Sequence, residues 1–338
     1  MAKYILRRLV YMAVMFLVVS LAMFLLYNLI PSDPVRAELE PMRSVLKPAE
    51  YQEMYLKLRA ERGLDDPIML RYGRWMGLAP EKNGQYDGLL QGDFGQSSYY
   101  KKPVRDVISD PISITMFMNI FNTILALGIT IPLGIRTAVK KNGTFDKSVQ
   151  VFSIVGYSIP IFIISLIFIY FFAVELRWFP VMGTKSPGAS FTGWKAFTDR
   201  MYYMSLPLIV MTFAALGGMT RYVRAAMIDA LSMDYIRTAR AKGVREKSAI
   251  YVHAWRNALI PIITVIIGWF LTIFSGSLII ENTFAIDGMG KLYILGLNQK
   301  DYELVLAIQM FYTIVSLIGV LLTDLSYGLV DPRVRVNK

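Results

Sequence analysis

Six long stretches without a charged side chain constrain this chain more than any other feature. Each holds 20 or more residues free of Asp, Glu, Lys and Arg, and together they are Leu9–Ser32, Pro111–Ile135, Ser148–Val174, Met201–Thr220, Asn257–Ile280 and Leu304–Thr323. A helix needs roughly 20 apolar residues to cross a bilayer. Because lipid offers no partner to an open strand edge, all six are expected to be helices. The sequence therefore predicts an all-α membrane protein with six transmembrane helices.

The distribution of charge indicates how these helices cross the membrane. The formal net charge is +11. If the N-terminus lies inside, the cytoplasmic segments are residues 1–8, 136–147, 221–256 and 324–338. They hold 18 Lys and Arg against 6 Asp and Glu, or +12, whereas the other side holds 18 against 19, or −1. Basic loops stay inside, so we expect a multi-pass protein of the cell membrane with both termini cytoplasmic. The excess charge predicts contact with anionic membrane lipid rather than with nucleic acid.

Several kinds of chemistry lack the residues they need. The chain has no Cys and a single His, His253, which excludes disulfides, thiolate sites and a multi-His metal site. No phosphate-binding G-x-x-x-x-G-K-[ST] motif and no nucleophile elbow occurs. We therefore expect no catalytic residue, no metal and no cofactor bound by this chain. The middles of the spans also lack the ionisable groups of ion-coupled carriers, so the energy for any transport should come from another subunit.

The order of the stretches divides the chain into four parts. We assign 1–32 to an N-terminal anchor and the first transmembrane helix, and 33–110 to a small extracytoplasmic subdomain. Residues 111–330 form a core of five transmembrane helices with a charged loop at 228–257, and 331–338 form a cytoplasmic tail.

The segment between the first two spans is too long to be only a connector. Within it, Pro48–Arg62 is predicted to be an amphipathic helix that stops at Gly63. Its apolar side chains recur at helical spacing, namely Tyr51, Met54, Tyr55 and Leu58.

The stretch Asp234–Pro261 is crowded with charge although it lies between two apolar segments. Its first part, Met233–Lys242, contains good helix formers and no proline. Gly243 suits a helix stop, because the residue after a helix often needs a positive φ. A second helix is expected over Arg245–Asn257. Charge alone is typical of a plain basic cytoplasmic loop, whereas a helix, a Gly turn and a second helix with small residues would let another protein approach closely.

The amino-acid sequence of this stretch favours a surface that another protein approaches over a plain basic loop. A-R-A-K-G, followed by H-x-x-R-N-A-L-I-P, resembles the EAA loop of ABC-importer permeases, and more closely its variant in the oligopeptide, dipeptide and nickel permease family. The stretch departs from the general EAA pattern at Arg237, Thr238 and Arg256, where that pattern has Glu, Ala and Pro. Further similarities cover nearly the full length: the opening that ends in P-S-D-P, G-Y-S-I-P at 156–160, L-R-W-F-P at 176–180, E-N-T-F-A-I-D-G-M-G at 281–290 and D-P-R-V-R at 331–335.

The resemblance implies a type I ABC importer permease fold, of the first permease type with a long outer loop after span one. Such a subunit translocates oligopeptides or dipeptides delivered by an extracytoplasmic binding protein. It implies a heterodimer with a second homologous permease and two cytoplasmic ATPase subunits, which bind ATP and Mg. Import of nickel chelate or another small solute stays open as an alternative, as does an ATP-independent channel or membrane scaffold.

The resemblance also assigns the charged stretch a role, because the family docks this loop, its coupling helix, in a groove of the ATPase. Ala239, Ala241 and Gly243 would form the close-approach surface. Arg237, Arg240 and Lys242 would form its polar rim, and His253 and Arg256 would brace the second helix. The candidate coupling residues are Arg237, Ala239, Arg240, Ala241, Lys242, Gly243, Val244, His253 and Arg256.

A second candidate site is the translocation path. Asn119 and Asn122 share one helical face with neighbouring Thr123, and such a face should look at protein or water rather than lipid. Two interpretations stay open, interhelical hydrogen bonding and a place on the path. Ser158 and Pro160 lie in the third span, where proline bends a helix and so suits a gated path, although bent helices also occur in static bundles.

Overall fold

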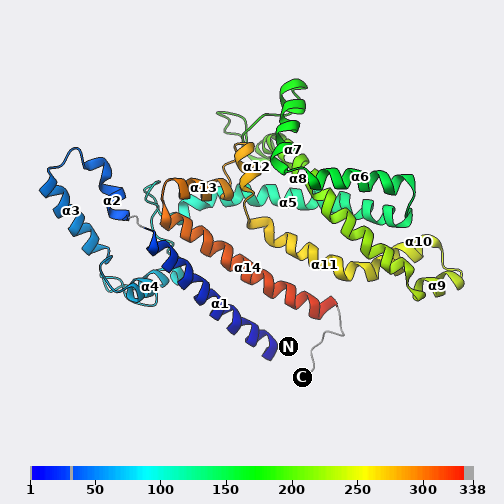
Figure 1. Ribbon diagram of the computed structural model, residues 1–338, viewed down its shortest axis with the longest axis horizontal. Helices are drawn as coiled ribbons and strands as arrows, with labels where there is room; N and C mark the ends of the chain where they lie inside the picture. The colour runs from blue at the N-terminus through cyan, green and yellow to red at the C-terminus, as the bar shows by residue number, and fades with distance from the viewer. Residues whose placement is uncertain (1, 31–32, 331–338) are drawn as a thin grey trace. The chain divides into compact units, whose positions relative to one another are not determined.

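The computed structural model describes residues 2–30 and 33–330, and α-helices dominate them (Figure 1). The α-helices are α1 (Ala2–Leu29), α2 (Pro34–Leu39), α3 (Pro48–Glu61), α4 (Ile68–Met76), α5 (Val104–Val139), α6 (Thr144–Ser158), α7 (Ile161–Phe168), α8 (Gly193–Ser232), α9 (Asp234–Ala241), α10 (Glu246–Ser248), α11 (Trp255–Leu271), α12 (Leu278–Thr283), α13 (Met289–Asn298) and α14 (Tyr302–Val330). Short turns of 3-10 helix lie at Glu40–Met42, Leu89–Gln91 and Thr272–Phe274, and π-helical turns at Ile169–Glu175 and Ala249–Ala254.

Five helical segments are long and apolar enough to cross a membrane, and a sixth crossing is available if one bent pair counts as a span. The expected all-α fold is therefore confirmed. The third expected span is that bent pair: α6 and α7 meet at 103° next to Pro160. The uncharged run of the fifth expected span, Asn257–Ile280, predicted a helix that ends at Ile280, and this end is wrong. The helix stops at Phe274, because the backbone leaves helical geometry at Ser275 before α12 begins.

The described residues group into two compact units. The first comprises Met1–Asp110 with Leu292–Leu317, and the second comprises Pro111–Lys291 with the residues from Ile318 onward. Two sequence motifs fall partly or wholly outside the described residues. These are the P-S-D-P at the end of the first span, of which 31–32 are not described, and the tail 331–338 with its D-P-R-V-R.

The first unit has a core where α1, α4 and the beginning of α14 meet. Phe24, Met76 and Met310 are buried there together with Leu89 and Leu306. Aromatic rings of α4 also pack against α1, with centroids 5.5–5.6 Å from that of Phe24. This packing fixes α4, which follows α3 in the subdomain, against the first span.

The helix expected in the subdomain is confirmed as α3, and Gly63 follows it with φ +63°. Tyr55 is buried against α2, and Tyr51 and Leu58 pack beside it. Met54 differs from the expectation, because it is 38% exposed and is not among the residues of that cluster.

The second unit is built on close contacts between α5, α6 and α8. A Cβ on Gly134 of α5 would lie 2.6 Å from Val223 of α8, and one on Gly217 of α8 would lie 2.6 Å from the Ser153 carbonyl of α6. Any larger residue at these two glycines would force the helices apart. A second apolar cluster joins α7, α8 and α12 around Ile164, Leu208 and other buried side chains.

Candidate functional site

The charged stretch folds as expected, into a short helix, a tight turn and a second helix. α9 ends in a Schellman motif: the Val244 amide donates to the Ala239 carbonyl (3.2 Å) and the Gly243 amide to that of Arg240 (2.9 Å). Gly243 has φ +77° and no heavy atom within 4 Å of where its Cβ would lie. The turn is therefore fixed by its backbone and remains sterically open on its outer side.

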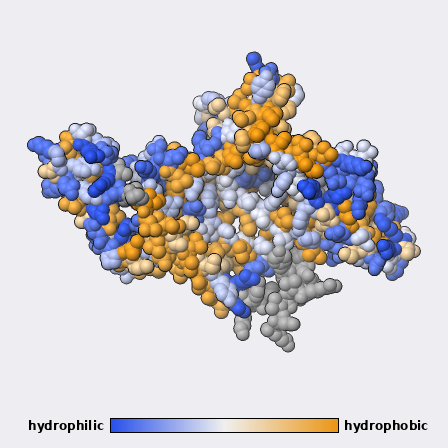
Figure 2. Space-filling model, viewed as in Figure 1, coloured by the Kyte–Doolittle hydropathy of each residue, from blue (hydrophilic) through white to orange (hydrophobic). Residues whose placement is uncertain are grey.

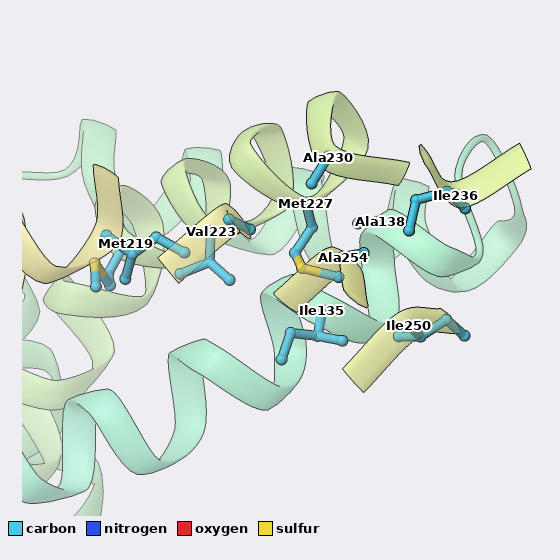
Figure 3. Packing of buried hydrophobic residues seen from close by; sticks show 11 residues of the cluster. Ile135, Ala138, Met219, Val223, Met227, Ala230, Ile236, Ile250 and Ala254 are labelled. Carbon is cyan, nitrogen blue, oxygen red and sulfur yellow. The ribbon is translucent and has the colours of Figure 1, made fainter. Parts of the chain in front are cut away.

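One buried side chain attaches α9 to the rest of the second unit. Ile236 is fully buried, and it lies in an apolar cluster drawn from several helices (Figure 3). Met227 and Ala230 of α8, and Ile250 and Ala254 of the π-helical turn, are among its members. α9 is thus packed, through Ile236, against α8 and the helix that continues into α11.

The opposite side of α9 and its turn is a charged surface. Figure 2 shows hydrophilic side chains gathered over α9 and α10. The exposed candidate residues are Arg237, Arg240, Ala241, Lys242 and Gly243, while Ala239 and Val244 are half-buried.

An ion pair spans the turn. The Arg240 guanidinium donates to both carboxylate oxygens of Glu246, at 2.6 and 3.1 Å. Arg237 makes a looser contact with Asp234, 3.4 Å long. The first pair closes the turn between α9 and α10, so Arg240 contributes to the shape of this surface as well as to its charge.

His253 and Arg256 lie apart from this turn, on the helix that follows it. Both side chains are exposed, and they line a surface depression with apolar residues of α11, including Ile260. The opposite face of this helix is buried, because Ile250 and Ala254 lie in the same cluster as Ile236. The bracing role of His253 and Arg256 stays a prediction.

A buried ion pair that the sequence did not predict holds α6 to α8. Asp146 is fully buried, and its carboxylate accepts two bonds from the Arg224 guanidinium, at 2.6 and 2.7 Å. The Asn142 amide (2.8 Å) and Gln150 Nε2 (2.9 Å) also donate to it. This saturated carboxylate fixes the last part of α8, the helix that leads into α9.

The polar residues of α5 take part in internal hydrogen bonds. The Asn119 side-chain amide is buried and donates to the carbonyls of Thr272, Ile273 and Ser275 at 3.2, 3.1 and 2.9 Å. It therefore satisfies carbonyls that the end of a helix leaves unpaired. The geometry favours the hydrogen-bonding interpretation of Asn119 over a place on a path.

The other path candidates divide between the interior and the surface. Thr123 is buried and Asn122 is half-buried, with its Oδ1 3.5 Å from Thr212 Oγ1 of α8. Ser158 and Pro160 are exposed at the break between α6 and α7. The structure thus does not bring the five path candidates together into one lining.

A buried carboxylate organises residues 275–291, here called the Glu281 loop. Glu281 is fully buried and accepts hydrogen bonds from Thr115 Oγ1 (3.1 Å) and from the amides of Ser277 (3.2 Å) and Lys291 (2.9 Å). The Met289 amide donates in turn to Thr115 Oγ1, at 2.9 Å. The network ties both ends of the loop to α5. Sequence reasoning noted Glu281 within a motif but gave it no role.

Glycines let this loop fold tightly around the carboxylate. A Cβ on Gly276 would lie 2.1 Å from the Gly290 nitrogen, and one on Gly288 would lie 2.5 Å from Glu281 Cδ. Burial raises the pKa of Glu281, against the opposing effect of its hydrogen bonds. The glycines of this loop and its buried carboxylate are therefore parts of one internal scaffold.

Known families and relatives match nearly the whole chain. A family model described as binding-protein-dependent transport system inner membrane component matches residues 130–336, and a companion model for the N-terminal membrane component matches residues 1–119. The chain is 33% identical to the oligopeptide transport system permease protein AppB of Bacillus subtilis (strain 168) over 335 residues, covering 99% of each chain. It is 32% identical over 341 residues to the dipeptide transport system permease protein DppB of the same strain, covering 100% of this chain and 99% of that protein.

A solved structure shares the fold. It is a chain from inward-facing conformations of the MetNI methionine ABC transporter, with a TM-score of 0.54 and 15% sequence identity. The match covers 67% of this chain and 97% of that one.

Proposed function

This chain belongs to the family of binding-protein-dependent transport system inner membrane components, and we propose that it is the permease subunit of an ATP-driven importer of oligopeptides or dipeptides. The observation that carries the cargo assignment is the full-length match to oligopeptide and dipeptide permeases. The chain would sit in the cell membrane with both termini in the cytoplasm, as the distribution of Lys and Arg favours.

The partners follow from the same assignment. A second homologous permease would complete a heterodimer, two cytoplasmic ATPase subunits would bind ATP and Mg, and an extracytoplasmic protein would deliver the peptide. In this assembly the exposed surface of α9 and its turn would dock on an ATPase subunit. His253 and Arg256, exposed on the following helix, would extend that contact.

The mechanism we infer is a rigid-body switch. Closure of the ATPase dimer would move α9, and Ile236 would pass that movement to α8 and α11 through the cluster in which it is buried. The helices would then exchange inward-facing and outward-facing arrangements. Each nucleotide state must bind one arrangement better than the other, because a ligand shifts an equilibrium only through such a difference.

Substitution of Gly243 by Trp tests the docking surface. The bulky ring would occupy the open outer side of the turn, so substrate-stimulated ATP hydrolysis by the assembled complex should be abolished. Gly188→Trp is a matched control, because Gly188 also has a positive φ and open surroundings but lies in the segment between α7 and α8. Normal stimulated turnover in the Gly243 variant would refute the assignment of this turn.

Uptake into vesicles tests the cargo. Vesicles would contain the chain with its partner subunits and ATP, and would be offered labelled peptides of two to six residues and a labelled nickel chelate. ATP-dependent accumulation of peptide would support the proposal and bracket the cargo length. Accumulation of nickel chelate alone would replace the cargo and leave the docking surface in place. Flux without ATP would refute the importer.

A further inference from the structure

A cavity of about 330 Å³ lies within the first unit, at the C-terminal end of α1 and the N-terminal end of α14. Aromatic and charged side chains share its wall, among them Phe24, Tyr27, Arg71, Trp75, Tyr302 and Glu303. This volume is in the range of sites that hold small molecules or the polar group of a larger one. Nothing in the proposed coupling or transport roles uses this cavity.

The cavity contains an arginine without a carboxylate partner. Arg71 is half-buried, and its Nη2 donates to Asn28 Oδ1 at 2.6 Å. Among the ion pairs of the described residues, Arg59 and Arg74 each have an aspartate, while none includes Arg71. Burial, and then the nearby Arg59, lowers the pKa of Arg71, while Asp65 and Asp66 oppose the shift. A negatively charged hydrogen-bond acceptor next to Arg71 would stabilise its charged form further.

The remaining charges of the cavity wall do not supply that acceptor. Asp33 is committed to Arg59 (2.8 Å) and to the Tyr55 hydroxyl, and Glu303 accepts the Gln96 amide at 3.1 Å. Arg59 is also paired with Asp65, at 2.5 Å, so it has two carboxylate partners. Arg71 is therefore the arginine of the wall at which an anionic ligand would meet no competing ion pair.

The place of the cavity indicates the source of that anion. It adjoins the end of a membrane-spanning helix, where Tyr and Trp are typical of the lipid headgroup level. Only 11% of the α1 span is buried, and Leu26 and Leu29 in its last turn are 57% and 77% exposed. These side chains offer an apolar surface for acyl chains that continue from a bound headgroup.

We propose that this cavity binds the phosphate of a membrane phospholipid, with the Arg71 guanidinium donating to the phosphate oxygens and the acyl chains lying along α1. Guanidinium groups bind phosphate with several donors in a fixed geometry, which a lysine cannot reproduce fully. The aromatic rings would flank the headgroup. This site is independent of the cargo, and failure of the peptide proposal would leave it standing.

Native mass spectrometry of the purified, delipidated complex tests the site. The probes are dioctanoyl-phosphatidylglycerol, dioctanoylglycerol, inorganic phosphate and tri-alanine. Loss of a charge-assisted bond should weaken phosphatidylglycerol binding by about tenfold or more in Arg71→Gln. Arg71→Lys should retain part of the affinity. Arg43→Gln is the matched control, because it removes an exposed arginine of the same unit that is paired only with Glu40.

Three results would overturn the proposal. One is equal phosphatidylglycerol affinity in Arg71→Gln and the unaltered chain. Another is an equal loss of dioctanoylglycerol binding in Arg71→Gln, since that lipid lacks phosphate. The third is tri-alanine binding that depends on Arg71, which would assign the cavity to a peptide carboxylate instead. Weak Arg71-dependent binding of inorganic phosphate beside strong phosphatidylglycerol binding would support the lipid as the source.

Discussion

The stretch around α9 and the Glu281 loop use charge in opposite ways. The α9 stretch displays several charged side chains and is attached through a single buried apolar residue, Ile236. The Glu281 loop buries one carboxylate completely and surrounds it with hydrogen-bond donors. A helix with many exposed charges and few buried side chains, such as α9, is typical of a surface that another protein covers. A lone buried charge with all its partners within the chain is a structural centre, and its neighbours depend on it.

The largest effect should follow from removing the Glu281 carboxylate. Glu281→Ala would leave the Thr115 hydroxyl and the Ser277 and Lys291 amides without their acceptor. Several unsatisfied buried donors should lower the free energy of unfolding by about 3 kcal/mol or more. Thermal unfolding of the purified protein in detergent measures this. Glu281→Gln keeps one acceptor oxygen and should lose less, and an unchanged midpoint for Glu281→Ala would contradict the contrast drawn above.

A smaller and local effect is expected at the attachment of α9. Ile236→Ala would leave a cavity in the cluster of Figure 3 and should destabilise the docking of α9 by about 2–4 kcal/mol. Hydrogen exchange of the α9 amides should accelerate, while that of the Glu281 loop stays unchanged. Tyr235→Ala, at an exposed neighbour, is the control. Exchange that accelerates equally in both variants would mean that Ile236 is not the attachment point.

The smallest effect should come from the ion pair across the turn. Arg240 and Glu246 are both exposed, so a double-mutant cycle to Ala should give only a small coupling energy, which falls with added salt. Glu246→Ala should consequently cost far less stability than Glu281→Ala. A similar loss for the two carboxylates would remove the distinction between the regions.

Local sequence patterns predicted those features of the structure that depend on neighbouring residues alone. The positive φ of Gly243 follows from helix-stop chemistry, and the presence of α3 follows from its Pro at the first turn and the Gly after its end. The all-α fold follows from the length of the apolar runs. Composition could not reveal the break at Ser275, because the run of apolar residues continues through it.

Interactions between residues far apart in the sequence could not be predicted from the sequence. Arg224 lies 78 residues from Asp146, and Glu281 lies 166 residues from Thr115. No local spacing shows which polar groups will meet after packing. Asn119 illustrates the limit: its place on a polar helix face predicted a hydrogen bond, but its acceptors at the end of another helix are set by tertiary structure.

The length of α8 gives it a further property, that of a lever. Its 40 residues make a continuous helix of about 60 Å, roughly twice the hydrocarbon thickness of a bilayer. A tilt of about 10° at one end of such a rod displaces the other end by about 10 Å. The Asp146–Arg224 ion pair fixes α8 to α6 near the end that leads into α9, and so provides a pivot point for the helix. Small displacements there are amplified along α8, with no need for a large deformation at the point where force is applied.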